Sequence, residues 1–435
     1  MKRLKKHVFK PIQNQLNTQI DNAIASGDAF VHGDKDFSRN RKLSPHALIR
    51  MVYEFTDQSV SRFIPFASSI PASVRDVSPS AVCQAFGKIR PDIFKKIFFR
   101  FNSACFSDGL RLFKGHQLLA VDGSEVYVGP NRKDPDKSKG KSKKSGKRHF
   151  YHLNAEYDVL NHFYTNAIVQ PGSEKNEDAA LIELTLSARD LPIYIADRGY
   201  EALMTFYRFI QKGILFVIRI KDEDSSTSIL RHYPTPDEDE YDIDFDVILT
   251  DKNNSHVKAH WDTYKYISHY KKEPEFDGSV HELELHGRVV RYTAVSEGKE
   301  THFTVLTNLS RDQFSTEDIR EIYHLRWQEE ISFRDLKHKI DLDTVHFRKL
   351  ERIEAEIFAK LTVYNLMSCV RNALEKRINK AEKRRKYEYR IDFAFLTDVC
   401  RAYLFRKRIP ANLDHLLLSR QQPVRPGRSD RRKKR

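Results

Sequence analysis

Cysteine is scarce in this chain of 435 residues, which contains four: Cys83, Cys105, Cys369 and Cys400. Because they lie far apart and form no C-x-x-C pair, the sequence has neither the ligand spacing of a zinc site nor a disulfide framework. The 18 histidines show no H-x3-H pair with a nearby cluster of acids, so we assign none to a metal. This cysteine usage is typical of a protein in a reducing compartment.

Long hydrophobic runs are missing as well. No stretch is apolar over the roughly 20 residues that a membrane-spanning helix needs. The basic N-terminus, residues 1–6, is not followed by the hydrophobic run of a signal peptide. We therefore expect a cytoplasmic protein with no membrane partner.

Positive charge, by contrast, is in excess. The chain carries 75 Lys and Arg against 60 Asp and Glu, a formal net charge of +15. In a large folded protein this excess indicates a polyanionic partner, with nucleic acid as the first candidate and a generally basic surface as the alternative. The length predicts two or three domains.

Residues 1–112 have the pattern of a helical domain. Ser44-Pro45 and Ser78-Pro79 each combine a helix N-cap with proline at the first helical position. The predicted helices cover residues 10–24, 47–55, 81–89 and 93–105. Small and basic residues on these helices suit a module that binds DNA ends, and a plain helical bundle explains them equally well.

The next part of the chain predicts a mixed α/β sheet. Apolar runs at residues 118–121 and 192–196 are each followed by an acid, Asp122 and Asp197. Further predicted strands lie at residues 152–157, 163–169 and 214–220, and predicted helices at 177–187 and 201–211. This order, with acids at strand ends, is that of a ribonuclease H-like sheet within residues 113–345. Residues 131–148, rich in Lys, Gly and Ser, predict a mobile loop.

Four further segments complete the chain. Polar sequence with alternating strands predicts a β-rich insertion at residues 221–310. Ser315 begins a helix with a capping box, in which Asp318 replaces the usual Glu or Gln. Residues 346–418 predict C-terminal helices, and residues 419–435 form a Pro-, Arg- and Lys-rich tail that we expect to be disordered when free.

Four polar residues follow that capping box at steps of 3, 4 and 7: Tyr323, Arg326, Glu330 and Lys337. On a single α-helix these steps bring the four side chains within an arc of roughly 60°, spread over about 20 Å. Apolar residues beside the arc would dock the helix onto a core: Ile322, Leu325, Phe333, Leu336 and Ile340. A solvated face with salt bridges is the alternative interpretation.

Carboxylates from Asp122, Asp197 and Glu330 would together make an oxygen-rich site suited to Mg²⁺ or Mn²⁺. Two such ions about 4 Å apart can activate an attacking water and neutralise the leaving 3′ oxygen of a phosphodiester. Arg326 and Lys337 would then hold neighbouring phosphates. Tyr323 would donate a hydrogen bond or stack on a base.

With these residues the chain resembles the DDE transposases of bacterial insertion sequences, in the insertion-sequence-four group, whose signature is Y-x2-R-x3-E-x6-K. The four polar residues match that signature in type and spacing. Asp122-Gly123-Ser124 resembles the first-Asp motif of the group, and Asp197-Arg198-Gly199-Tyr200 resembles its second motif. The resemblance covers residues 118–365, including the β insertion, but neither the N-terminal helices nor the basic tail.

The resemblance implies a magnesium-dependent enzyme of cut-and-paste DNA transposition. Asp122, Asp197 and Glu330 would hold two Mg²⁺ ions, for which Mn²⁺ would substitute. Water would cut one strand at the transposon end, and the freed 3′ hydroxyl would form a hairpin that is reopened and joined to target DNA. The implied partners are terminal inverted repeats, target DNA and, when two ends are paired, a second copy of the chain. The implied location is a bacterial cytoplasm, at the nucleoid.

Other residues are candidates for DNA contact. Arg198 and Arg219 flank the predicted core strands, where a structural salt bridge is the alternative role. In the relatives a Trp of the insertion helps hold a flipped base, and Trp261 is the one Trp in this segment; a core or surface Trp is the alternative. The basic segments 133–148 and 425–435 would contact phosphates without reading bases.

Two other functions remain open. One is a transposase-derived protein that binds DNA without cutting it, and the presence of all three carboxylates counts against it. The other is a stand-alone ribonuclease H-like nuclease that hydrolyses DNA but does not join it. Arg326 and Lys337 beside Glu330 favour instead a site that holds two DNA ends.

Overall fold

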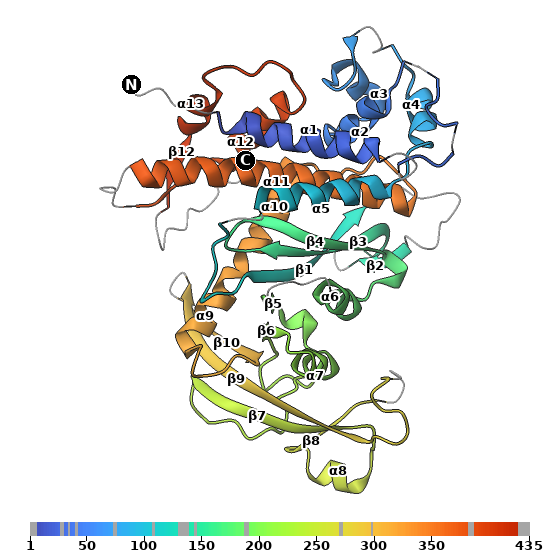
Figure 1. Ribbon diagram of the computed structural model, residues 1–435. Helices are drawn as coiled ribbons and strands as arrows, with labels where there is room; N and C mark the ends of the chain where they lie inside the picture. The colour runs from blue at the N-terminus through green and yellow to red at the C-terminus, as the bar shows by residue number, and fades with distance from the viewer. Residues whose placement is uncertain are drawn as a thin grey trace.

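The computed structural model describes the following residues: 7–26, 30–33, 35–39, 42–72, 76–106, 109–128, 139–142, 146–186, 191–268, 273–296, 299–381 and 387–424. Figure 1 shows helices at one end of the molecule, a mixed sheet in the middle and a long twisted extension of that sheet at the other end. Within these ranges no helix combines the length and the apolar character needed to cross a membrane.

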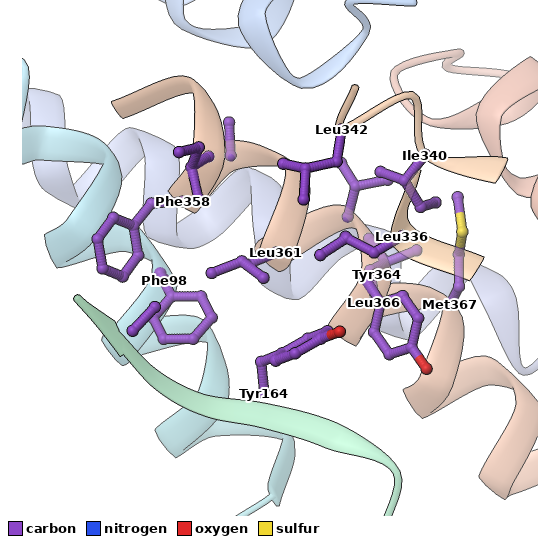
Figure 2. Packing of buried hydrophobic residues seen from close by; sticks show 14 of the residues in the cluster. Phe98, Tyr164, Leu336, Ile340, Leu342, Phe358, Leu361, Tyr364, Leu366 and Met367 are labelled. Atoms are coloured by element: carbon purple, nitrogen blue, oxygen red, sulfur yellow. The ribbon is translucent and has the colours of Figure 1, made fainter. Parts of the chain in front are cut away.

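Helices from both ends of the chain lie together on one side of the sheet. They are α1 (Phe9–Ala25), α2 (Pro45–Tyr53), α3 (Val60–Phe63), α4 (Pro79–Phe86), α5 (Asp92–Phe106), α11 (Leu350–Ala381), α12 (Phe393–Tyr403) and α13 (Leu413–Leu418). α1, α2 and α5 pack against α11 and share one hydrophobic core with it. Figure 2 shows part of this core, where Phe98 of α5 lies beside Phe358 and Leu361 of α11.

The predicted N-caps are confirmed at two of these helices. The side chain of Ser44 accepts a hydrogen bond from the amide of Ala47 and so begins α2. The side chain of Ser78 does the same for the amide of Ala81 at the start of α4. A proline follows the cap in both helices. Its missing N–H group costs nothing there, because the N–H groups in the first turn of a helix have no partner within the helix.

One sheet of 10 strands runs through the molecule, in the order β2-β3-β1-β5-β6-β10-β9-β7-β8, with β4 paired to β3. Its central strands are β1 (Leu118–Tyr127), β3 (Gly146–Asp158), β4 (Phe163–Pro171), β5 (Ile193–Ala196) and β6 (Leu215–Arg219). β1 is antiparallel to β3 and parallel to β5, and β5 is parallel to β6. The predicted strands of a mixed α/β sheet are therefore present.

The start of β1 is apolar at every position because both of its faces are covered. Leu118 and Ala120 face the core that contains α5 and α11. Leu119 and Val121 face a second core that includes residues of α6 (Glu177–Thr185) and α7 (Leu203–Gln211). A strand buried on both faces reads as a continuous apolar run rather than an alternating one.

The strands predicted for residues 221–310 extend this same sheet. They are β7 (Tyr241–Thr250), β8 (Tyr264–Tyr266), β9 (Glu282–Ser296) and β10 (Lys299–Thr307). β9 pairs antiparallel with both β7 and β10, and β10 pairs antiparallel with β6. Along β7 buried Phe245 and Val247 alternate with exposed residues, as expected for a sheet with one covered face.

Two segments predicted to be irregular contain strands. Residues 139–142 form β2 (Lys139–Ser142), which pairs with the start of β3, and residues 421–423 form β12 (Gln421–Pro423), which pairs with β11 (Tyr389–Ile391). The predicted loop and tail were wrong for these residues, because backbone hydrogen bonds hold such strands without burying apolar side chains. Residues 131–138, 143–145 and 425–435 lie outside the described residues.

Candidate active site

Asp122 and Asp197 follow paired positions on neighbouring parallel strands. β1 and β5 pair in parallel up to Val121 and Ala196, and each acid is the next residue. β1 itself continues to Tyr127 in its pairing with β3, so the predicted strand end at Asp122 was wrong. The parallel pairing with β5 does stop there, so the two acids meet at one edge of the parallel part of the sheet. Both acids line one hollow of about 250 Å³ at this edge.

The carboxylate of Asp122 lies in an environment that disfavours its charge. Burial has the largest effect, and the nearby carboxylates of Asp197 and Glu330 add to it. The amide of Gly123 and the Arg326 guanidinium act in the opposite direction, and the net effect raises the pKa of Asp122 to about 6. Acids that repel one another in this way are typical of a site that binds a cation.

Asp197 begins a short 3₁₀ turn, η5 (Arg198–Tyr200). One oxygen of its carboxylate, Oδ1, accepts a hydrogen bond from the amide of Gly199 at 2.7 Å. A Cβ atom at position 199 would lie 2.9 Å from that oxygen, closer than such atoms approach. Gly199, the glycine of the second motif, therefore lets the backbone approach the Asp197 carboxylate.

The spacing predicted a single helix for the four polar residues of the signature, and this prediction was wrong. They lie on α9 (Thr316–Leu325) and α10 (Trp327–Lys339), with Arg326 between the two helices. The amides of Arg326 and Glu329 bond to carbonyls three residues earlier, so the chain tightens into 3₁₀ geometry at this point. The predicted capping box of Ser315 and Asp318 at the start of α9 is confirmed.

The alternative of a solvated charged face is also wrong, because two of the four side chains are buried. Tyr323 is 4% exposed and Arg326 is 5% exposed. The Arg326 guanidinium lies 5.6 Å from the centre of the Tyr323 ring, and its Nη2 donates a hydrogen bond to Oε1 of Glu330 at 2.7 Å. Of the predicted apolar stripe, Ile322, Phe333, Leu336 and Ile340 are buried.

The structure brings Lys337 to the hollow that Asp122 and Asp197 line. Glu330 is near enough to raise the pKa of Asp122, but its carboxylate is held by Arg326. Among the described residues no three His, Cys, Asp or Glu side chains are grouped so that they could hold a metal ion. The hollow is thus lined by several carboxylates and two lysines, with the Glu330 carboxylate in an ion pair beside it; the lining charged residues are Asp122, Glu125, Lys175, Glu177, Asp197 and Lys337.

The other predicted DNA contacts lie in three separate places. Arg198 is exposed and lines a neighbouring hollow of about 740 Å³ with Asp197 and Lys221. The Arg219 guanidinium stacks over Phe303 at 4.6 Å from the ring centre. Trp261 is 42% exposed and lies next to α8 (Ser255–Ala259), which Figure 1 shows at the end of the sheet remote from β1.

Two further groups near Asp122 were missed in the sequence. Glu329 is fully buried, and burial followed by the charge of Asp122 raises its pKa well above the usual range. Glu177 lines the same hollow as Asp122 and lies 3.1 Å from the buried ring of His152. Neither position carries a spacing signal, and the alternation within residues 152–157 groups His152 with the polar residues Asn154 and Glu156.

Comparison with known proteins identifies the class to which this arrangement belongs. The chain is a member of the transposase DDE domain family, whose model matches residues 113–366. It is 25% identical over 266 residues to the transposase for insertion sequence element IS231F of Bacillus thuringiensis subsp. israelensis, covering 55% of this chain and 54% of that protein. It is 37% identical over 75 residues to the transposase for insertion sequence element IS421 of Escherichia coli, covering 17% of this chain and 20% of that protein.

These similarities confirm the resemblance to DDE transposases of bacterial insertion sequences. The matched region spans about half, or less, of the length of these curated relatives. Among solved structures, a piggyBac transposase synaptic complex with hairpin DNA has a TM-score of 0.44 and 10% identity, covering 97% of this chain and 86% of that one. A likeness of that degree does not define the fold in detail.

Proposed function

We propose that this chain is a transposase that cuts and joins DNA at the hollow lined by Asp122 and Asp197. The observation that carries the proposal is the pairing of β1 with β5, which brings these two acids together in a chain of the DDE family. The strand order β4-β3-β1-β5-β6, with β1, β5 and β6 parallel, supports a ribonuclease H-like sheet. The net charge of +15 supports a DNA partner.

The donor set fits a hard divalent cation such as Mg²⁺ or Mn²⁺. Asp122 and Asp197 would hold it through carboxylate oxygens, and Glu330 would join them when Arg326 releases it. The raised pKa of Asp122 supports this assignment, because a cation would offset the repulsion that Asp197 and Glu330 exert. When bound, such ions activate an attacking oxygen and neutralise a leaving one.

Cationic side chains around the hollow would hold the DNA backbone. Lys337 lines the hollow itself, and Arg198 and Lys221 line the adjoining one beside Asp197. Each would contact a phosphate, Lys221 in exchange for Glu201; the buried Arg326 would likewise have to exchange Glu330 for a phosphate. The partners would be transposon ends and target DNA in a bacterial cytoplasm, with two copies of the chain when two ends are paired.

The proposed sequence of steps uses this one hollow for two kinds of nucleophile. Water cuts one strand at the transposon end and frees a 3′ hydroxyl. That hydroxyl attacks the opposite strand to form a hairpin, which water reopens before the end is joined to target DNA. Asp122, Asp197 and Glu330 act in every step, while Tyr323, Arg326 and Lys337 orient the strands.

The test is cleavage of a labelled transposon-end duplex by three isosteric variants, Asp122→Asn, Asp197→Asn and Glu330→Gln. Each should abolish cleavage in Mg²⁺ while gel-shift binding of the same duplex stays nearly intact, because metal ligands and not phosphate contacts are removed. Cleavage that persists in any one of these variants would refute the three-carboxylate assignment.

One observation favours a second function, a DNA-binding protein that does not cut. Glu330 is bonded to Arg326, and the described residues contain no group of three metal ligands. If the wild-type chain binds the end duplex but leaves it intact in both Mg²⁺ and Mn²⁺, this second function replaces the first.

A further inference from the structure

The hollow that Asp122 and Asp197 line contains two carboxylates that none of the three motifs includes, Glu125 and Glu177. Glu125 accepts a hydrogen bond from the hydroxyl of Tyr127. Glu177 is the first residue of α6 and lines that hollow together with the two aspartates. Its helix is capped by Asn176, whose side chain accepts a hydrogen bond from the amide of Ala179. Glu177 thus approaches the site from an element that carries neither aspartate.

Two basic side chains lie against one oxygen of Glu177. Nε2 of His152 lies 3.1 Å from Oε1 of Glu177, and Nζ of Lys175 lies 2.9 Å from the same oxygen. His152 is 1% exposed, so its ring is fixed by packing within β3. The nearby His152 ring lowers the pKa of Glu177 most, and Lys175 lowers it further. Burial acts in the opposite direction, and the net pKa is about 2. Glu177 is therefore an oriented anion throughout the neutral pH range.

The glycines of the two aspartate motifs leave room for this group. A Cβ atom on Gly123 would lie 2.4 Å from Nε2 of His152 and 3.0 Å from Oε1 of Glu177. A Cβ atom on Gly199 would lie 4.0 Å from the other oxygen of Glu177, Oε2. The carboxylate thus lies between the residue that follows Asp122 and the turn that follows Asp197, with one oxygen toward each.

We propose that Glu177 is a further catalytic residue, which accepts a hydrogen bond from the water that attacks the phosphodiester, and that His152 and Lys175 are positioning residues for it. This inference rests on the proposed function. The two basic groups lie against Oε1, so Oε2 is the oxygen that faces the water. Glu177 is assigned to the water and not to the metal, because the basic groups of His152 and Lys175 already lie against its carboxylate.

The step is a hydrolysis and involves no change of oxidation state. The water oxygen forms a bond to phosphorus, the bond between phosphorus and the 3′ oxygen breaks, and that oxygen takes up a proton and leaves as a hydroxyl. The water gives its proton to solvent, because a carboxylate with so low a pKa orients the water but does not retain the proton.

Water and the 3′ hydroxyl differ in how they are oriented for attack. A free water must be oriented by the protein, whereas the 3′ hydroxyl of a cut end is already placed by the DNA to which it belongs. Loss of Glu177 should therefore slow the steps that use water and spare the steps that use the 3′ hydroxyl. A misplaced nucleophile costs about a hundredfold in rate.

The experiment compares two substrates with the full-length chain in Mg²⁺. An intact end duplex reports the first nick, and a precut duplex that presents a 3′ hydroxyl reports joining to target DNA. Glu177→Gln should slow nicking about a hundredfold and leave joining within a few-fold of wild type. Glu183→Gln, which changes an exposed residue of the same helix, is the matched control and should change neither rate.

Equal slowing of both reactions by Glu177→Gln would overturn the inference, because the residue would then support the site as a whole. An unchanged nicking rate would overturn it too. Joining by the variant also shows that it is folded. Failure of the inference is separable from failure of the proposed function: if Asp122→Asn still nicks the duplex the function itself is wrong, whereas if Asp122→Asn is inactive only the role of Glu177 is in question.

Discussion

Asp122 is an acid whose ionised form the metal-free protein disfavours. Its pKa is raised from the usual 3.8 to about 6, so the charge costs stability above that pH and costs nothing when the group is protonated. Asp122→Asn should therefore raise the free energy of unfolding by about 1–3 kcal/mol at pH 8 in EDTA and change it little at pH 4. Urea denaturation at the two pH values measures this. An equal change at both would indicate a packing effect instead.

Arg326 and Lys337 belong to one signature but differ in burial. Arg326 is buried and bonded to Glu330, so Arg326→Ala should lower the free energy of unfolding by about 1–3 kcal/mol. Lys337 is only partly buried, so Lys337→Ala should lower the free energy of unfolding by less than Arg326→Ala does. If Lys337 holds a phosphate of the DNA strand that must bend back when the hairpin forms, Lys337→Ala should slow hairpin formation and joining more than the first nick.

A time course with labelled end duplex on denaturing gels resolves the nicked, hairpin and joined products. His338→Ala, on the same helix, is the control for Lys337→Ala. Equal slowing of nicking and hairpin formation by Lys337→Ala would limit its role to binding the substrate.

The site shows which parts of such an assembly can be predicted from residue patterns. Asp122 and Asp197 were predictable because each follows an apolar run, and the two runs pair in parallel, although β1 continues beyond Asp122 to Tyr127. The ion pair of Arg326 with Glu330 was not, because it depends on how the chain turns between α9 and α10. Glu177 was missed because its place beside Gly123 arises from pairing between β1 and β3 and the position of α6.

Among the secondary-structure elements, those with side chains to bury were predicted and those held by the backbone were not. β1 and β5 are buried along the whole length of their pairing, and the N-caps Ser44 and Ser78 marked two helices. β2 and β12 are short strands whose sequences offer little to bury. The single helix expected from residue 316 onward is two helices, because periodicity alone does not show a tightened turn.

The pairing of β12 with β11 divides the C-terminal tail into two parts with different expected roles. Truncation after Val424 removes the basic residues 425–435 but keeps the pairing of β12 with β11. DNA binding should weaken on all duplexes alike, and the slope of log K against log[salt] should flatten by about 0.9 for each phosphate that the tail neutralises. Fluorescence anisotropy over a salt series measures this. Weakening confined to the transposon-end sequence would show instead that the tail reads bases.

In the molecule as a whole, the N-terminal helices are not an independent layer. α1, α2 and α5 share one hydrophobic core with α11, although more than 200 residues of sequence separate α5 from α11. Sequence periodicity marked each helix but not this long-range packing, which is why residues 1–112 looked separable. In the same way the β-rich insertion looked like an added segment, whereas β10 pairs with β6 and continues the core sheet.

This shared core predicts the behaviour of a truncated chain. A fragment that begins at residue 113 would expose the face of α11 that Phe98 and its neighbours cover. We expect the fragment to lack cooperative unfolding and to bind a hydrophobic dye such as ANS, which reports exposed apolar surface. Near-UV circular dichroism and a urea titration test this against the full chain. A sharp unfolding transition in the fragment would show that the helices form a separate domain.

In the proposed site, Asp122 and Asp197 together hold a divalent cation at the edge of the sheet. Electron paramagnetic resonance of Mn²⁺ in the presence of end duplex tests it most directly, because it counts bound metal without requiring catalysis. We predict bound Mn²⁺ with the wild-type chain, and its loss with either Asp122→Asn or Asp197→Asn, while the Glu183→Gln control binds as wild type does. Equal binding of Mn²⁺ by the wild-type chain and both aspartate variants would contradict the account.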